Sequence, residues 1–222
     1  LHNSLPAGNY RLDVCLNDEQ ATQAALGWAL AGYRFERYSS NKLGKCGPSL
    51  VWPEACDREH VTSTVQATFL VRDLINTPAN DMGPEQLAGC ARALAKKYNA
   101  QCSVIVGEDL LEANFPAIHA VGRASVNAPR LIDVQWGNDS NPKVTLVGKG
   151  VCFDTGGLNL KETSGMKLMK KDMGGAAHVL GLASMIMAAD LPIRLRVLVP
   201  AVENSVSGNA MRRQDVITMR DG

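Results

Sequence analysis

Between residues 84 and 200 the sequence passes repeatedly from helix-like to strand-like patterns, and this alternation constrains the fold more than any other feature. Residues 84–98 and 174–189 carry apolar side chains at helical spacing. Short apolar runs typical of strands occur at 102–106, 117–121, 130–136, 143–147 and 193–200. Such alternation predicts an α/β domain with three layers, α/β/α, around a mixed and mostly parallel sheet. We expect Val144–Val147 to lie inside that sheet.

The residues before this region indicate a second, smaller unit. Residues 9–16 alternate as a strand does, and 39–48 are rich in Ser, Asn, Gly and Pro, as a loop is. A long helix is expected over roughly 58–75. We therefore expect a domain boundary near residue 56, with 1–56 as the tail of a smaller α/β domain and 57–222 as part of a larger one.

Composition and charge exclude several classes of protein. The 222 residues include 23 basic and 22 acidic ones, which leaves a net charge of +1. Nucleic-acid-binding surfaces normally need a basic excess. No apolar run approaches the ~20 residues that cross a bilayer. The six cysteines form no C-x-x-C pair, so we expect free thiols in a reducing, cytoplasmic environment.

One segment departs from ordinary scaffold composition: residues 147–161, VGKGVCFDTGGLNLK, which begin where an expected strand ends. Ligands bind at strand ends in open α/β sheets. Four glycines within ten residues permit turns that a Cβ would forbid. The segment carries Lys149, Asp154 and Lys161, and Asp172 follows immediately before an expected helix. These four side chains are the candidate functional residues.

Three chemistries compete for this segment. The phosphate-binding P-loop pattern fails because Gly150, and not Ser or Thr, follows Lys149, and the first glycine of the pattern is missing. The dinucleotide pattern G-x-G-x-x-G fails at Phe153. Carboxylates on a glycine-rich loop suit a divalent cation, and a dication lowers the pKa of a neighbouring lysine until its amine can bind metal. Alternatively, Asp172 caps a helix, Asp154 anchors a turn and the lysines are solvated. Residue types alone leave both interpretations open.

Four longer stretches closely resemble the leucine aminopeptidase (cytosol aminopeptidase) family. They are the segment above, MKLMKKDMGGAAHVLGLA at 166–183, DLINTPANDMGPEQLA at 73–88 and LPIRLRVLVPAVENSVSGNAMRRQDVITMRDG at 191–222. The likeness runs from about residue 57 to 222, whereas residues 1–56 resemble only the tail of the family's variable N-terminal domain. It implies that 57–222 are the first part of the catalytic domain of a two-metal exopeptidase. Such an enzyme removes N-terminal residues, leucine favoured, from peptides and amides.

The resemblance also implies roles for individual residues. Lys149 and Asp172 match ligands of one metal, and Asp154 matches the carboxylate that bridges both. Lys161 matches the catalytic lysine that polarises the scissile carbonyl or steadies the tetrahedral intermediate. Met169 matches a residue of the pocket for the first side chain. Two cations about 3.5–4 Å apart can share and acidify a water, and a lysine can stabilise a developing oxyanion. Manganese or zinc is the expected metal.

The sequence departs from the family in one respect. The family's second motif, Asn-Thr-Asp-Ala-Glu-Gly-Arg, does not occur in it. That motif supplies two further carboxylate ligands and the arginine that holds a bicarbonate base. We therefore expect the 222 residues alone to lack a complete site. The resemblance further implies a cytoplasmic homohexamer without a membrane partner.

The alternative function is a catalytically inactive family member that acts as a binding or assembly module. DNA is the partner that the family suggests for such a role, and the net charge of +1 argues against it. The four histidines fall in different elements, and His178 is expected on a helix surface. Lys170 and Lys171 are expected to contribute only loop polarity. Glu203 and Asn204 follow the end of an expected strand, which places them close to the candidate site by topology, and the resemblance implies a structural role for them.

Overall fold

The computed structural model describes residues 4–40 and 47–222. The chain folds into two compact units, Leu1–Leu70 and Val71–Gly222. Helix α2 (Arg58–Asn76) runs through the junction between them, and the domain boundary near residue 56 stays a prediction. Within the described part of the chain, no helix combines the length and apolar character that a membrane span requires.

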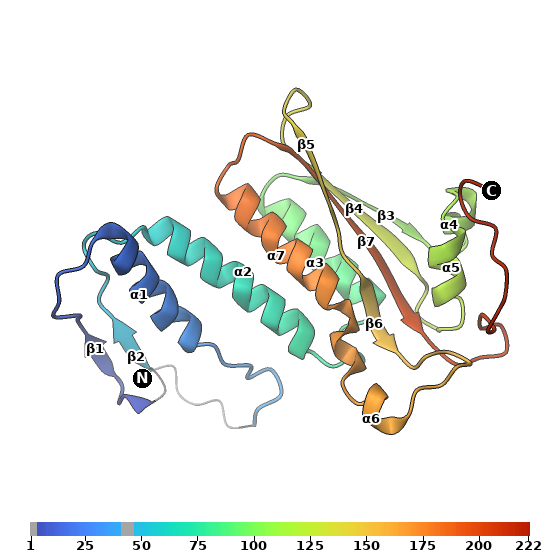
Figure 1. Ribbon diagram of the computed structural model, residues 1–222, viewed down its shortest axis with the longest axis horizontal. Helices are drawn as coiled ribbons and strands as arrows, with labels where there is room; N and C mark the ends of the chain where they lie inside the picture. Colours follow the sequence, from blue (N-terminus) through green and yellow to red (C-terminus); the bar gives the residue numbers. More distant parts are fainter. Residues whose placement is uncertain (1–3, 41–46) are drawn as a thin grey trace. The chain divides into compact units, whose positions relative to one another are not determined.

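The first unit is small. Its other elements are β1 (Gly8–Tyr10), α1 (Asp18–Ala31) and β2 (Pro48–Leu50). β1 and β2 pair in parallel (Figure 1). The strand expected over 9–16 is shorter because Leu12 and Val14 are exposed and give it no buried face. Most of the loop expected over 39–48 lies outside the described residues, as do His2 and Cys46.

The second unit contains the sheet and most of the helices. Its elements are α3 (Pro84–Lys97), β3 (Gln101–Val106), α4 (Asp109–Glu112), α5 (Pro116–Gly122), β4 (Arg130–Trp136), β5 (Lys143–Val147), β6 (Gly150–Asp154), α6 (Thr163–Met166), the 3-10 turn η2 (Met169–Met173), α7 (Gly174–Ala188) and β7 (Arg194–Asn204). The helices expected over 84–98 and 174–189 are confirmed, and so are the strands over 102–106, 130–136 and 143–147.

The sheet is mixed, as expected, but parallel pairing does not dominate it. Its order is β3-β4-β7-β5, and β6 also pairs with β7. β3 and β7 are both antiparallel to β4, whereas β5 and β6 are parallel to β7. β5 and β6 follow one another along the same side of β7, whose other side is taken by β4. Val144–Val147 therefore form an edge of the described sheet, and the expectation that they lie inside it is wrong.

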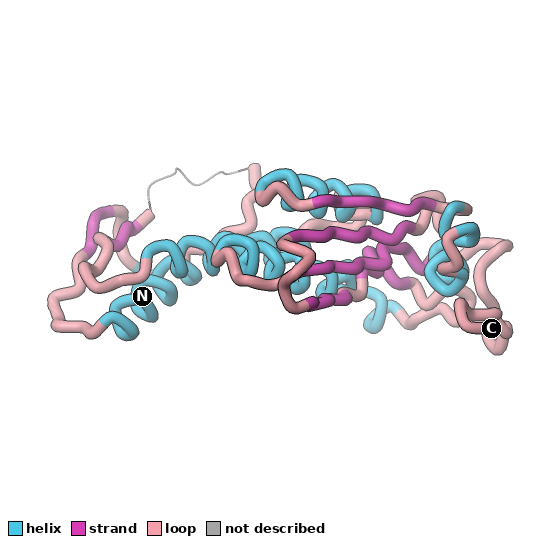
Figure 2. Tube along the Cα trace, turned by 90° about the horizontal axis from the view of Figure 1, so that it is seen from above, coloured by secondary structure: helices cyan, strands magenta, loops and turns pink. Residues whose placement is uncertain are grey.

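Helices lie on both faces of the sheet. α3 and α7 pack along one face, where Leu195, Val197 and Val199 of β7 are at most 1% exposed (Figure 1). α5 packs on the other face, and a Cβ on its Gly122 would lie 3.2 Å from Val202 Cβ. Figure 2 shows α4 and α5 together at one end of the strands. The α/β/α layering is therefore present, with the second helical layer covering one end.

Two expected elements differ from the structure. The run 117–121, expected as a strand, is helix α5. Pro116 occupies its first turn, where the fixed φ of proline favours a helix, and a five-residue apolar run does not distinguish helix from strand. Residues 150–154, expected as part of a glycine-rich loop, form strand β6 because they pair with the last four residues of β7.

Candidate metal centre

Lys149 lies in the two-residue interruption between β5 and β6. Gly148 keeps this interruption beside β7, since its N–H donates to Leu198 O at 3.0 Å. A Cβ on Gly148 would lie 2.7 Å from Ala176 Cα and 2.5 Å from Val179 Cγ2, so only glycine allows the strand to approach the first turns of α7 this closely. Lys149 O in turn accepts a hydrogen bond from Ala176 N at 2.8 Å. The backbone of Lys149 is thereby held at the start of α7.

Asp154 ends β6, and the loop after it returns Lys161 to its side. Gly156 has φ +87°, and a Cβ there would lie 2.4 Å from Asn159 O. The loop closes where Lys161 N donates to Thr155 O at 2.9 Å. Lys161 Nζ then lies 3.2 Å from Asp154 Oδ2. The glycine-rich loop therefore creates the first lysine–carboxylate pair.

The carboxylate of Asp154 accepts several hydrogen bonds. Its Oδ1 accepts from Gly156 N at 2.9 Å and from Asn204 Nδ2 at 2.7 Å. Burial acts to raise the pKa of Asp154. The hydrogen bonds from Gly156, Lys161 and Asn204 outweigh burial and hold that pKa below its ordinary value. The bond from Gly156 is the turn-anchoring contact that the alternative interpretation expects, and it occupies one of the two oxygens.

Asp172 lies in η2, directly before α7, but it does not cap the helix. Met173 takes the capping position, and no side-chain cap bond is found there among the described residues. Asp172 Oδ2 is buried and accepts no hydrogen bond of good geometry from the described residues. The Lys149 ammonium lies 2.9 Å from it as an ion-pair partner. A buried oxygen without a hydrogen bond is costly, so a positive charge at this point stabilises it.

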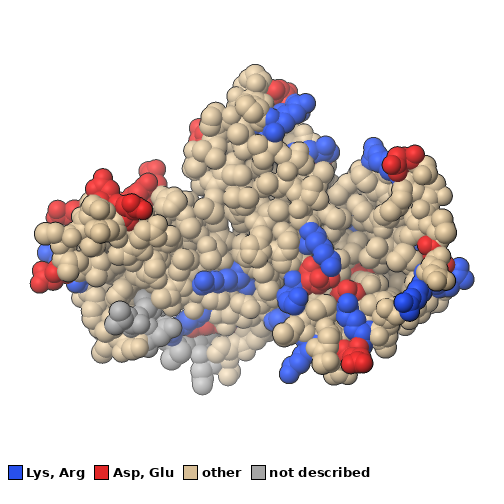
Figure 3. All heavy atoms as spheres, in the orientation of Figure 1, with Lys and Arg blue, Asp and Glu red and all other residues tan. Residues whose placement is uncertain are grey.

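The structure thus forms two lysine–carboxylate pairs on elements that pack against each other, β6 with its loop and η2. Figure 3 shows basic and acidic side chains interspersed in the region of α6 and the end of β6. Met169 opens η2 and is half-buried. Within residues 4–40 and 47–222, no group of three or more His, Cys, Asp and Glu side chains is arranged to hold a metal. Asp154 and Asp172 are the two carboxylates that pair with a lysine here.

Two contacts at the centre were not expected from the sequence. Asn204 was expected close to the site and in a structural role. Its hydrogen bond to Asp154 forms because β7 continues four residues beyond the expected end at 200. Lys170 donates to Asn76 O at 2.6 Å, at the last residue of α2, so its charge does more than add loop polarity. The contact of Asn204 with Asp154 could have been predicted only if the full length of β7 had been known. No local pattern indicates the contact of Lys170.

The described histidines and cysteines lie outside this centre. His60 begins α2, His119 in α5 pairs with Glu108 at 3.0 Å, and His178 is exposed on α7 as expected. Among the described residues, cysteines 15, 56, 102 and 152 are free thiols. Burial, with a smaller contribution from the charge of Glu203, raises the pKa of Cys152 to about 12. This thiol is therefore protonated and inert at neutral pH.

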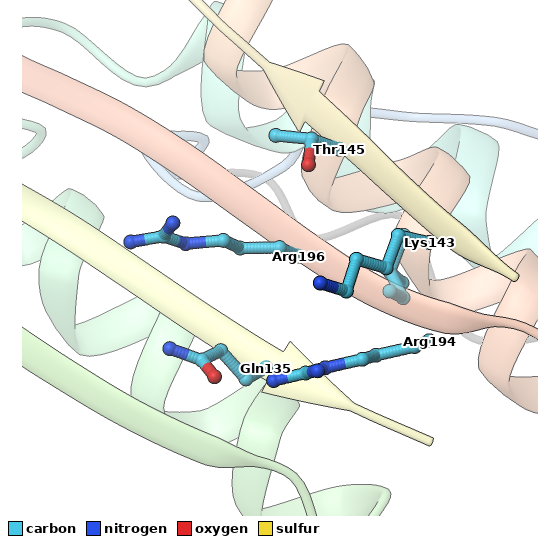
Figure 4. Close-up of a pocket in the computed structure, with 6 residues that line it drawn as sticks. Gln135, Lys143, Thr145, Arg194 and Arg196 are labelled. Atoms are coloured by element: carbon cyan, nitrogen blue, oxygen red, sulfur yellow. The ribbon is translucent and has the colours of Figure 1, made fainter. Parts of the chain in front are cut away.

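A separate hollow of about 350 Å³ lies on the sheet at the opposite end of β5 from Lys149. Figure 4 shows its labelled side chains, which come from β4, β5 and β7: Gln135, Lys143, Thr145, Arg194 and Arg196. Arg196 is bound to Asp133 at 2.7 Å, and Arg194 is paired with Asp139 at 3.1 Å. Two of its three cations are thus already compensated, which leaves little positive charge for an anionic ligand.

Comparison with known proteins decides the family. Residues 69–222 match the sequence model described as the cytosol aminopeptidase family, catalytic domain, and residues 1–47 match the N-terminal domain of M17 aminopeptidases. The chain belongs to the cytosol aminopeptidase family. The resemblance of the four motif stretches to this family is thereby confirmed.

Individual members of the family are similar over most of this chain. Peptidase B of Photorhabdus laumondii is 40% identical over an alignment of 185 residues, which covers 78% of this chain and 42% of the relative. A probable cytosol aminopeptidase of Xanthomonas axonopodis pv. citri is 45% identical over an alignment of 163 residues, which covers 72% of this chain and 33% of the relative. The chain therefore spans less than half the length of these relatives.

Solved structures of family members share the fold. The cytosol aminopeptidase of Coxiella burnetii has a TM-score of 0.93 and 50% identity, covering 99% of this chain and 48% of that protein. The bottromycin maturation enzyme BotP in complex with Mn has a TM-score of 0.85 and 35% identity, covering 96% of this chain and 48% of that one. Both alignments extend over nearly all of this chain, so the mixed α/β fold is confirmed.

Proposed function

We propose that this family member is a metal-dependent exopeptidase that removes the N-terminal residue, preferably leucine or another apolar residue, from peptides and amino-acid amides. One observation carries the proposal: the buried Asp172 Oδ2 has no hydrogen bond from the described residues and faces only the Lys149 ammonium. A carboxylate oxygen kept in this state is a natural ligand for a cation. Membership of an aminopeptidase family supports the reaction.

The residues present fit divalent metal ions. Asp154 keeps an ionised carboxylate because its pKa is lowered, and Asp172 offers its unbonded oxygen. Lys149, Asp154 and Asp172 would hold the metals, with Lys149 contributing a neutral amine. The relative determined in complex with Mn supports manganese, and zinc accepts the same ligand types. When bound, two such ions supply Lewis acidity and a water of lowered pKa.

Other side chains act on the substrate directly. Lys161 donates a hydrogen bond to the scissile carbonyl oxygen, where negative charge develops, and its position beside Asp154 keeps it oriented. Met169, half-buried at the start of η2, contacts the first side chain of the peptide. Its flexible thioether suits leucine and methionine.

Proposals about the metal ions, the oligomeric state, the cellular location and the domain division rest on membership of the family. We propose a pair of manganese or zinc ions with a bicarbonate base, a homohexamer and a cytoplasmic location. The names of the relatives, which include cytosol aminopeptidases, support the location. The division into an N-terminal domain, 1–56, and the first part of the catalytic domain, 57–222, belongs to the same proposal.

The test is carried out on the protein as its gene encodes it. Leucine amide hydrolysis is measured with Mn²⁺ or Zn²⁺, and Mn²⁺ affinity is measured for Asp154→Asn. We expect the variant to bind Mn²⁺ at least tenfold more weakly. Glu108→Gln is the control, because Glu108 is 82% exposed and pairs only with His119. Equal affinities in the two variants would show that Asp154 is a turn anchor only.

A gel shift with duplex DNA at low salt distinguishes the exopeptidase from the alternative function, a catalytically inactive binding module. Absence of hydrolysis together with DNA binding would replace the enzyme by a binding module. Hydrolysis without a shift is the expected result, since the chain carries a net charge of only +1.

A further inference from the structure

Asn204, the last residue of β7, lies directly opposite Asp154, the last residue of β6, in the register of the sheet. Its side-chain Nδ2 donates to Asp154 Oδ1 at 2.7 Å. Its backbone oxygen accepts from Thr155 N at 3.0 Å and from Thr155 Oγ1 at 2.8 Å. Gly157 packs so close that a Cβ there would lie 2.8 Å from Asn204 Oδ1. The amide is therefore fixed on the strand side and on the loop side.

This arrangement decides which oxygen of Asp154 is available. Oδ1 accepts from both Gly156 N and Asn204 Nδ2. Among the described residues, Oδ2 has Lys161 Nζ as an ion-pair partner, at 3.2 Å. A carboxylate can turn about its Cβ–Cγ bond, and two donors on one oxygen hold it in a single orientation. Oδ2 is thus kept directed away from the strand and toward the lysine.

We propose that Asn204 is a positioning residue for Asp154 in the metal centre, an inference that rests on the proposed function. An amide suits this place because it donates a hydrogen bond without bringing a charge. A lysine or arginine would repel a cation bound at Asp154, and an acid would repel the carboxylate itself. Removing a group that hydrogen-bonds to a metal ligand and orients it typically lowers metal affinity 10- to 100-fold.

The experiment replaces Asn204 by alanine in the protein as its gene encodes it. Free Mn²⁺ is followed by electron paramagnetic resonance during titration, which reports affinity without any turnover. We expect Asn204→Ala to bind Mn²⁺ 10- to 100-fold more weakly than the parent. Thermal unfolding in the presence of a chelator is recorded for the same samples.

Two control variants separate positioning from general stability. Asn209→Ala makes the same chemical change nearby, but Asn209 Nδ2 donates to Arg123 O and does not contact Asp154; its Mn²⁺ affinity should stay within twofold of the parent. Ser184→Ala removes the part-buried hydrogen bond between Tyr98, at the C-terminal end of α3, and Ser184 of α7; it should lower the unfolding temperature without changing Mn²⁺ affinity. A merely structural Asn204 would behave like Ser184.

The outcomes are distinct. A parent that binds Mn²⁺, with an Asn204→Ala variant that binds it equally well, overturns the positioning role and leaves the exopeptidase proposal standing. A parent that neither binds Mn²⁺ nor hydrolyses leucine amide overturns the proposed function, and the positioning role with it. Weaker Mn²⁺ binding by Asn204→Ala, with affinities close to the parent in the two control variants, supports both the positioning role and the proposed function.

Discussion

Individual side chains at the candidate centre differ in how firmly the fold holds them. Asp154 accepts two hydrogen bonds on one oxygen and an ion pair on the other. Asp172 has its ion pair with Lys149 alone, and the Lys149 side chain is 59% exposed. The carboxylate of Asp154 is thus preorganised, whereas Lys149 can move with little loss of packing.

The buried cysteine beside this region gives a prediction at the same scale. Because the pKa of Cys152 is raised to about 12, roughly one thiol in ten thousand is ionised at pH 8. We expect iodoacetamide to modify exposed Cys15 in the native protein at that pH and to leave Cys152 unmodified until the chain is unfolded. Peptide mass spectrometry measures both sites. Equal rates of modification in the folded protein would contradict the burial of Cys152.

Among the secondary-structure elements, the contact between the β5–β6 interruption and the start of α7 brings Lys149 to Asp172. This contact depends on close backbone packing, because neither Gly148 nor Gly175 has room for a Cβ. A Cβ on Gly175, for example, would lie 2.9 Å from Lys149 N. The strand end and the helix start therefore form one unit. A shift of either element would separate the ion pair.

Gly148→Ala tests this contact. The added Cβ would overlap Val179 and Ala176, so we expect a loss of about 1–3 kcal/mol in the free energy of unfolding, measured in urea. Gly89→Ala is the matched control, because Gly89 lies within α3 and nothing is within 4 Å of its added Cβ. Alanine there should raise stability by about 0.5–1 kcal/mol. Equal effects of the two substitutions would show that the close approach is unimportant.

At the scale of the whole molecule, the described sheet has two edge strands, β3 and β5. β5 pairs only with β7 among the described strands, and Val147 on it is 66% exposed. Unpaired edges and exposed apolar side chains favour association with further strands. The family's second motif is also absent from the sequence, so the two carboxylates and the arginine that the resemblance assigns to that motif are not among these 222 residues.

The isolated residues 1–222 are therefore expected to hold Mn²⁺ weakly and to be almost inactive. Removing a group that hydrogen-bonds to a metal ligand typically lowers metal affinity or activity 10- to 100-fold. We therefore expect turnover of leucine amide to be reduced by more than about 100-fold when carboxylate ligands themselves are lacking. The assay uses purified residues 1–222 verified by mass, with and without an added segment that carries the Asn-Thr-Asp-Ala-Glu-Gly-Arg motif. Robust turnover by the 222 residues alone would show that this motif is dispensable.

Local patterns predicted what depends on neighbours in the sequence. Periodicity located α3, α7 and the strands 102–106, 130–136 and 143–147, because one buried face leaves a regular spacing of apolar residues. The motif stretches indicated Lys149, Asp154, Lys161 and Asp172, and the structure pairs Lys149 with Asp172 and Lys161 with Asp154. Their roles as ligands stay predictions.

Only the tertiary structure decided which elements become partners. Apolar spacing shows that a strand has a buried face, but it does not show how many strands flank it, so β5 at the edge was not foreseen. β6 is a strand because β7 extends far enough to pair with it. The same extension places Asn204 against Asp154, 50 residues earlier in the chain. Contacts between distant segments depend on backbone pairing and close packing, and these are properties of the assembled sheet.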